Sequence, residues 1–456
     1  MSAINYFQSD ARIVTCGGLP LIGAMLQKAG IIDAFNKMPI ALCHPENQIL
    51  CSEVMVSAIA TMCTGSSDFE GIHLYDDDKS FYADALGVKR FPSSERYRQR
   101  LDQMGAGESK GLSFHKELRD MNINLLKSNH AQFHTNPDGY VCLDIDVTPH
   151  DQSKTKKEGI SRTYKGFDGY APINAYLDQY FINTEFREGK QHSQCGTEPF
   201  LIETIDICNQ LIGNARLLIR LDSGNDSVQN IGIIMERGHS FIIKRNPRKE
   251  SKEDWLSLAE QNAPIHYTPR EGKDVYIGST WKEVTYTGSD GNKHTSTIRI
   301  VFEVIKRTID KHGQCLLIPD IELHTFWDNT GYSDEKVIRL YQEHGTMEQY
   351  HSELKTDMDL ERLPSGKFAT NSLIYDISML AYNLLRMLGN WVADMKDSTP
   401  MRRLASRRRL MTVIMHIIHA PARIVMHSRS MRIDLGCSNI WAPVLIQLHD
   451  RICAAA

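Results

Sequence analysis

Two apolar runs that each lead into an aspartate constrain the fold of this chain more than any other feature. Residues 140–147 read YVCLDIDV, and residues 215–221 read ARLLIRL and are followed directly by Asp222. Apolar, β-branched runs of this length are typical of buried strands. Residues 171–182 have an apolar period near two and predict another strand, and residues 197–211 have a helical pattern. The alternation of strands and helix predicts an α/β layer with a central sheet.

A helical pattern late in the chain gathers polar groups on one face. Residues 341–355 read YQEHGTMEQYHSELK. With residues placed about 100° apart, four side chains lie within roughly 60° of one another: Tyr341, His344, Glu348 and Lys355. Glu353 is a rival to Glu348, but it lies roughly 140° around the helix from it and leaves this face.

The two aspartates and Glu348 suggest a two-metal site for phosphodiester chemistry. Hydrolysis and strand transfer develop negative charge that two metal ions about 3.5–4 Å apart can stabilise. Mg²⁺ prefers hard oxygen ligands. We expect Asp146 to bridge two Mg²⁺ ions, with Asp222 and Glu348 each binding one and with Mn²⁺ as a substitute. Asp144 points to the same side of its strand as Asp146, so periodicity does not separate them, but the strand end at Asp146 favours Asp146.

Composition places the chain among ordinary soluble proteins. Its 456 residues leave room for two to four domains, and 41% are hydrophobic and 24% charged. The most apolar stretch near the N-terminus, residues 19–35, is interrupted by Gln27, Lys28 and Asp33, which predicts neither a signal peptide nor a membrane span. The ten cysteines include no Cys-x-x-Cys pair. We therefore expect a cytoplasmic protein with reduced cysteines.

The charge distribution points to nucleic acid even though the net charge is −4. Residues 402–432 hold eight arginines and three histidines and no acid. Arginines without neighbouring acids are expected to lack partners within the chain and to contact phosphates. An acidic partner domain facing this stretch is the alternative. The candidate phosphate contacts are Arg402, Arg403, Arg407, Arg408 and Arg409.

Changes of pattern divide the chain into four parts. Residues 1–135 read as helical and include an arginine-bearing helix after Pro92, which makes them a candidate reader of DNA ends. Residues 136–239 and 327–390 form the expected α/β domain. Residues 240–326 are rich in strand patterns and interrupt it as an insertion. Residues 391–456 form a mostly helical basic region for DNA contact or dimerisation.

These motifs resemble a known family. Tyr341, Glu348 and Lys355 are similar to the Tyr-x2-Arg-x3-Glu-x6-Lys signature of bacterial insertion-sequence DDE transposases, the YREK class, with His344 where the class has arginine. The motifs LDIDVT and LDSGND, and the run from Gly345 to Arg386, are also similar to that class. The resemblance covers roughly residues 45–390.

The resemblance implies a fold and an activity. The fold is a ribonuclease-H-like catalytic domain with a β-rich insertion between the second aspartate and the glutamate. The activity is cut-and-paste transposition through a DNA hairpin by a nucleoid-associated homodimer that binds terminal inverted repeats and target DNA. Alternatives are a metal-dependent nuclease or resolvase of the same fold, and a domesticated DNA-binding protein that no longer cuts.

The resemblance also suggests roles for individual residues. Lys355 takes the family's phosphate contact. His344 either replaces the arginine, although neutral imidazole is a weaker phosphate ligand, or fills a buried polar position. A flipped base needs an aromatic ring to hold it, and Trp281 and Trp327 are the candidates, each with a core position as the alternative.

Overall fold

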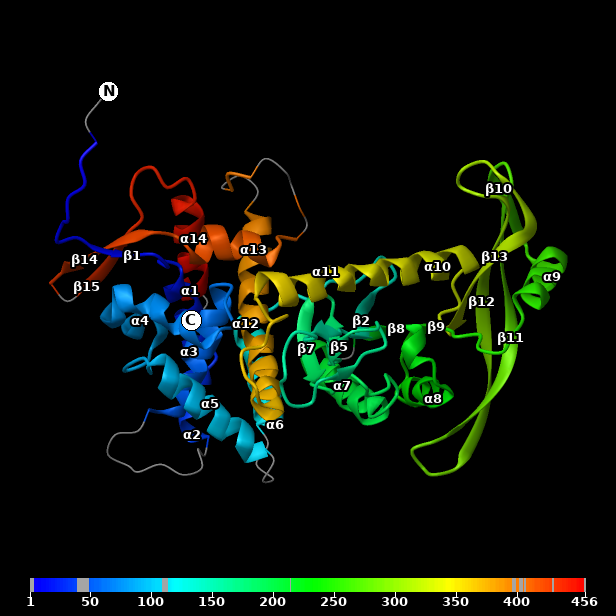
Figure 1. Cartoon of the computed structure of the whole chain (residues 1–456), viewed down its shortest axis with the longest axis horizontal. Coiled ribbons are helices and arrows are strands. Elements are labelled where there is room, and N and C mark those ends of the chain that lie inside the picture. Colours follow the sequence, from blue (N-terminus) through cyan, green and yellow to red (C-terminus); the bar gives the residue numbers. More distant parts are fainter. Residues whose placement is uncertain are drawn as a thin grey trace.

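A nine-stranded sheet runs from the centre of the molecule to one end, where its longest strands lie, and a helical body forms the other end (Figure 1). The computed structural model describes residues 4–38, 49–108, 114–213, 215–395, 399–401, 405, 407–428 and 430–454. The strand order in the sheet is β10-β11-β12-β13-β9-β8-β2-β6-β7. No helix within these ranges is long and apolar enough to cross a membrane.

Five strands form the part of the sheet that carries the acidic motifs. These strands are β2 (Tyr140–Val147), β6 (Ile173–Leu177), β7 (Tyr180–Glu185), β8 (Arg216–Leu221) and β9 (Ser240–Lys244). Strands β2, β8 and β9 are parallel, whereas β6 runs antiparallel to β2 and β7 antiparallel to β6. Helices α7 (Thr197–Ile212) and α8 (Val228–Glu236) provide the connections that parallel neighbours need. The strands predicted at residues 140–147 and 215–221 and the helix at residues 197–211 are confirmed.

One predicted strand is a hairpin. The apolar run at residues 171–182 folds as β6 and β7 because Asp178 turns the chain with a φ of 56°. Aspartate tolerates this left-handed conformation better than most residues do. All residues of β6 are buried, so the run lacks the polar alternation that would have marked two strands.

The β-rich insertion extends the central sheet instead of forming a separate one. It contains α9 (Lys252–Asn262), β10 (Ile265–Arg270), β11 (Lys273–Thr287), β12 (Lys293–Ile309) and β13 (Cys315–Asp328). Strand β13 pairs with β9, with Trp327 opposite Ile243. Helix α10 (Asp334–Gln342) packs across β9, β11 and β12 through an apolar core that includes Val337 and Leu340.

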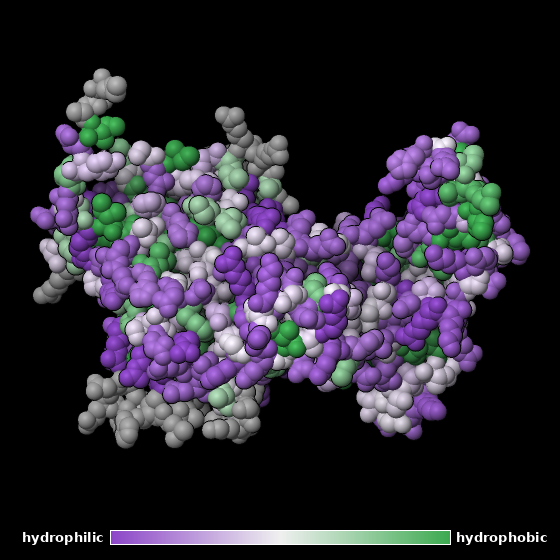
Figure 2. All heavy atoms as spheres, in the orientation of Figure 1, coloured by the Kyte–Doolittle hydropathy of each residue, from purple (hydrophilic) through white to green (hydrophobic). Residues whose placement is uncertain are grey.

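Helices from both ends of the chain form the body at the other end of the sheet. Helices α3 (Cys51–Cys63), α5 (Ser94–Glu108) and α6 (His115–Ser128) pack against the 27-residue α12 (Phe368–Asp394), whose apolar run explains its burial. The described residues before the sheet also form α1 (Leu19–Lys28), α2 (Ile31–Lys37), α4 (Lys79–Leu86) and a 3₁₀ helix (Phe69–Asp77). Figure 2 shows a largely hydrophilic surface on the viewed face, with apolar side chains gathered on this body and near the outer end of the insertion.

The C-terminal region is mixed, which corrects the mostly helical expectation. It contains α13 (Leu410–Val413), a π-helical turn (Ile414–Ile418), β14 (Ala422–His427), β15 (Ser430–Asp434) and α14 (Ala442–Ala454). Strand β14 pairs on one side with β15 and on the other with β1 (Arg12–Val14) near the N-terminus. This pairing joins segments roughly four hundred residues apart, which local sequence patterns do not reveal.

The single helix predicted over residues 341–355 departs from regular α-helical winding at two places. Helix α10 continues through a 3₁₀ turn (Glu343–Thr346) into α11 (Met347–Ser352) and then into a π-helical turn (Glu353–Asp357). A 3₁₀ turn advances by more than 100° per residue and a π turn by less. Positions beyond these turns therefore leave the face that regular α-helical spacing assigns to them.

Candidate active site

The first two acids lie next to each other because the strands that carry them are paired. Asp144 of β2 is opposite Arg220 of β8 in the parallel register. Asp146 and Asp222 each follow two residues later, so both project from the same face of the sheet. They line one cavity of about 430 Å³, together with Tyr341, His344 and Glu348 from the segment after the insertion.

Asp146 and Asp222 repel each other in this cavity. Burial and the charge of Asp222 raise the pKa of Asp146 to about 7. Each carboxylate has one local hydrogen bond: the backbone N–H of Val147 donates to Asp146 at 2.7 Å, and Asn225 donates to Asp222 at 2.7 Å. Two adjacent carboxylates that repel each other fit a hard cation, because the cation replaces the proton on Asp146 that otherwise relieves the repulsion.

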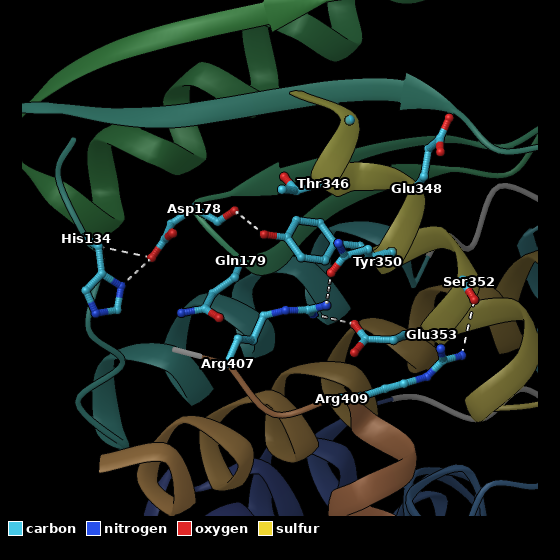
Figure 3. A pocket seen from close by; sticks show the side chains of 12 residues that line it. His134, Asp178, Gln179, Thr346, Glu348, Tyr350, Ser352, Glu353, Arg407 and Arg409 are labelled. Carbon is cyan, nitrogen blue, oxygen red and sulfur yellow. Dashed lines mark hydrogen bonds and ion pairs between the residues drawn. The ribbon is translucent and has the colours of Figure 1, made fainter. Parts of the chain in front are cut away.

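Glu348 lies on the boundary between two cavities. It is exposed and lines both the cavity of the two aspartates and a second one of about 910 Å³. In the close view of the second cavity its side chain points away from Arg407 and Glu353 (Figure 3). Within the part of the chain that the structure describes, no three His, Cys, Asp or Glu side chains converge closely enough to hold a metal ion. Glu348 therefore shares a cavity with the aspartate pair without joining it in a compact cluster.

Asp144 and Asp146 differ in their hydrogen-bond partners, which distinguishes the two candidates for the first acid. Asp144 is 1% exposed and accepts hydrogen bonds from Arg220 at 2.6 and 2.7 Å and from His344, whose Nδ1 is 2.8 Å away. Burial acts to raise the pKa of Asp144, but the charges of Arg220 and His344 hold it below its usual value. Its oxygens are occupied by protein donors, so Asp144 has a positioning role.

Partners and burial also distinguish Glu353 from Glu348. Its side chain is buried and receives ion pairs from Arg386 and from Arg407 at 2.7 Å, and a hydrogen bond from the backbone N–H of Leu410 at 3.1 Å. Arg386 is itself fully buried. Glu353 compensates buried positive charge and does not line the cavity of Asp146.

His344 occupies a buried polar position. Besides its bond to Asp144, its ring lies 5.6 Å from that of Tyr341, which in turn packs 4.9 Å from Phe326. These contacts support the interpretation of His344 as a buried polar group that fixes the segment after α10 to β2.

Lys355 does not line the cavity that the other three residues of the predicted face share. Its amine donates to the carbonyl of Pro149 and forms a 3.1 Å ion pair with Glu361, and it is not among the residues that line the cavity. The 3₁₀ and π turns described above explain the displacement. Lys355 ties the π turn to the segment that follows β2.

The basic stretch has acidic partners, which corrects the expectation that it lacks them. Arg407 pairs with Glu353, and Arg409 pairs with Asp357 at 2.8 Å. These acids come from the π turn some fifty residues earlier, so the sequence around the arginines does not show them. Arg408 is buried. Arg407 and Arg409 line the second cavity (Figure 3), whereas Arg402 and Arg403 lie outside the described residues.

Neither tryptophan candidate lies in the cavity of the aspartates. Trp327 is 4% exposed, and its indole N–H donates to Asp226 at 2.8 Å beneath the guanidinium of Arg245. These contacts support the alternative that Trp327 is a core residue and does not hold a flipped base. Trp281 of β11 is 65% exposed but lines a different pocket, beside α9.

Sequence reasoning missed several residues at this site. His351 places its Nδ1 3.9 Å from Asp146, and burial together with the charge of His344 lowers the pKa of His351 to about 3, so the ring is neutral. Its position three residues after Glu348 is a helical spacing that could have revealed it. Lys244 at the end of β9 also lines the cavity, as do Tyr164 and Lys165 from a loop without periodic pattern.

Comparisons with known proteins identify a family. The family model described as "Transposase DDE domain group 1" matches residues 8–456. No curated protein matches the sequence. Among solved structures, the cryo-EM structure of the piggyBac transposase synaptic complex with hairpin DNA is similar at 10% identity and a TM-score of 0.44, over 96% of this chain and 85% of that one.

Proposed function

Since this chain belongs to the transposase DDE domain group 1 family over nearly its whole length, we propose that it performs cut-and-paste transposition of a bacterial insertion sequence of the YREK class. The observation that carries the proposal is the pair of aspartates at the ends of adjacent parallel strands, which share a cavity with Glu348. The chemistry is metal-dependent phosphodiester hydrolysis followed by strand transfer.

The strand order supports a ribonuclease-H-like catalytic domain. Five strands lie in the order β7-β6-β2-β8-β9, with β2 central and β6 antiparallel to it, and the last of them, β9, falls at the start of the range expected for the insertion. We assign residues 136–239 and 327–390 to this domain and residues 240–326 to the insertion, with residues 1–135 binding transposon ends. Residues 391–456 contact DNA or a second protomer.

The donor set fits Mg²⁺. Asp146, Asp222 and Glu348 would hold two ions, and Mn²⁺ has the same preference for carboxylate oxygens. When bound, the ions supply activation of the attacking oxygen and stabilisation of the leaving oxygen. The protein fixes the geometry: Arg220 and His344 hold Asp144 and thereby join β2, β8 and the segment after α10, from which the three ligands project.

The DNA would lie along the two adjoining cavities. Gly345 and Glu348 line both, and Arg407 and Arg409 line the second. Phosphate contacts are proposed for these arginines and for Arg402 and Arg403, with Tyr341 contacting the strand at the cut, whereas the buried Arg408 and His344 would act only through the residues they support. For Lys355 such a contact requires its ion pair with Glu361 to open. Two ends must be cut and joined together, so we propose a homodimer that acts on DNA in the cytoplasm.

Product analysis tests the reaction. A labelled duplex that carries an element end, identified from short inverted repeats flanking the reading frame, is incubated with the protein and Mg²⁺. We expect a nick at the end, then a hairpin on denaturing gels, and then joining to target DNA. A duplex with a scrambled end is the control. Cleavage that never yields a hairpin or a joined product would instead identify a nuclease, and tight binding without cleavage a DNA-binding protein.

The raised pKa of Asp146 predicts the pH dependence of the metal requirement. Below about pH 7 Asp146 holds a proton that a metal ion must displace. The Mg²⁺ concentration for half-maximal cleavage should therefore rise about tenfold for each pH unit below 7 and level off above it. Mg²⁺ titrations of cleavage between pH 5.5 and 8.5 measure this. A requirement that stays constant across this range would contradict the coupling between the two aspartates.

A further inference from the structure

A small hairpin carries an aromatic ring and an amine into the cavity of the two aspartates. Strands β4 (Ser161–Arg162) and β5 (Asp168–Tyr170) are joined by a loop whose Tyr164 and Lys165 line this cavity. Tyr164 is 63% exposed, and Lys165 is also exposed. Neither forms a hydrogen bond, an ion pair or a ring contact with another described residue, so both are available to a ligand.

The hairpin holds these two side chains in place. The backbone N–H and the hydroxyl of Thr163 both donate to the carbonyl of Phe167 at 2.8 Å, and the N–H of Gly166 donates to Thr163 at 3.0 Å. Gly166 has a φ of 85°, a conformation that side chains rarely adopt. A turn closed by three hydrogen bonds presents its tip with little conformational freedom.

The base of the hairpin is fixed to the helical core. Strand β5 also pairs with β3 (His150–Asp151), and Gly169 approaches the backbone of His150 so closely that a Cβ atom would lie 1.8 Å from its carbonyl oxygen. The imidazole of His150 is buried and lies 3.1 Å from the hydroxyl of Tyr375 in α12. The tip therefore moves with the same framework that carries Asp146.

Other aromatic side chains near the site are already occupied. Tyr341 packs against Phe326 and His344, and Phe326 is buried. Trp327 is buried and Trp281 lines a different pocket. Among the described aromatic residues that line the cavity, Tyr164 is exposed, whereas Tyr341 and His324 are half-buried and Phe326 and His344 are buried.

We propose that Tyr164 stacks on a base next to the scissile phosphate while Lys165 contacts a neighbouring backbone phosphate, so that the hairpin tip holds the DNA strand against the aspartates. The proposal rests on the transposase function above. An exposed ring in a polar cavity suits the apolar face of a base, and stacking of this kind tolerates any sequence. Lys165 also lowers the pKa of Asp146 through its positive charge, and the same charge would attract the strand toward two carboxylates that repel phosphate.

Substitution of Tyr164 combined with removal of single DNA bases tests the stacking. Tyr164→Ala should slow single-turnover cleavage roughly 5- to 100-fold, whereas Tyr164→Phe should cleave like the wild type. An abasic site at the stacked position should remove the difference between wild type and Tyr164→Ala, and abasic sites elsewhere should leave it unchanged. Tyr267→Ala, at an exposed tyrosine of β10 outside the cavity, is the matched control.

Lys165 is tested by the salt dependence of end binding. The logarithm of the binding constant for the DNA end falls linearly with log[salt]. Lys165→Gln should reduce the magnitude of this slope by about one, and Lys165→Arg should restore it. Lys156→Gln, an exposed lysine of the preceding loop that does not line the cavity, should show a smaller change.

The possible outcomes separate failure of the proposed function from failure of the stacking role of Tyr164. Absence of cleavage by the wild type would overturn the proposed function and this inference with it. Normal cleavage by the wild type and by Tyr164→Ala would overturn the stacking role alone. A loss in Tyr164→Ala that Tyr164→Phe shares, or that persists at every abasic position, would also overturn it, because the ring face would then not be what matters.

Discussion

Replacement of Asp146 or Asp222 by asparagine is expected to reduce end cleavage by roughly 10³-fold or more while end binding persists. Asparagine keeps the size of the side chain but removes the charge that a metal ion requires. Loss of one preorganised electrostatic group at a reacting phosphate typically costs two to three orders of magnitude in rate, and loss of a metal ligand removes more than one such interaction. The strand ends should remain folded, because the substitution relieves the repulsion that raises the pKa of Asp146.

Single-turnover cleavage and gel-shift binding of the same labelled end measure the two properties separately. Asp206→Asn is the matched control, since Asp206 is an acid on α7 that pairs with Arg237 at the surface. Its cleavage rate should equal that of the wild type. If binding and cleavage fall together in Asp146→Asn and Asp222→Asn, these acids are structural and the assignment of the metal ligands is wrong.

Removal of Glu353 is expected to cost about 3–5 kcal/mol of unfolding free energy. Its carboxylate compensates Arg386, which is fully buried, and it also binds Arg407 and the N–H of Leu410. Glu353→Ala leaves the buried guanidinium without its counter-charge, which is the costly way to break a buried ion pair. Denaturant-induced unfolding followed by circular dichroism, together with the thermal midpoint, measures the loss.

Glu348→Gln is the control for this prediction, because Glu348 lies five residues earlier on the same segment and is exposed. Its unfolding free energy should change by less than about 0.5 kcal/mol. Equal stability of Glu353→Ala and the wild type would show that the network around Arg386 is compensated by other groups. The pair of variants thus separates the glutamate assigned to catalysis from the one assigned to folding.

Local sequence patterns were sufficient for the strands and the helix that build the cavity. The apolar runs before Asp146 and Asp222 predicted two strands, and the parallel register that brings the acids together follows from their pairing. The same patterns could not distinguish Asp144 from Asp146. That distinction depends on Arg220 and on His344, which lies 200 residues further along the chain.

Other features depended on long-range contacts or on irregular backbone. Regular helical spacing placed Lys355 with Glu348, but 3₁₀ and π turns displace it. The partners of Arg407 and Arg409 lie more than fifty residues before them. Tyr164 and Lys165 sit in a turn whose sequence has no period, so their position at the cavity follows from the small sheet that carries them.

The central claim is that Asp146, Asp222 and Glu348 together bind the catalytic metal ions. Glu348 is the decisive residue, because it lines the cavity of the two aspartates but does not form a compact cluster with them. Single-turnover cleavage of a labelled element end in Mg²⁺ by the wild type and by Glu348→Gln tests that claim most directly. We predict a nick and then a hairpin for the wild type, and neither product for Glu348→Gln despite equal end binding. Cleavage by Glu348→Gln at the wild-type rate would contradict the three-carboxylate site.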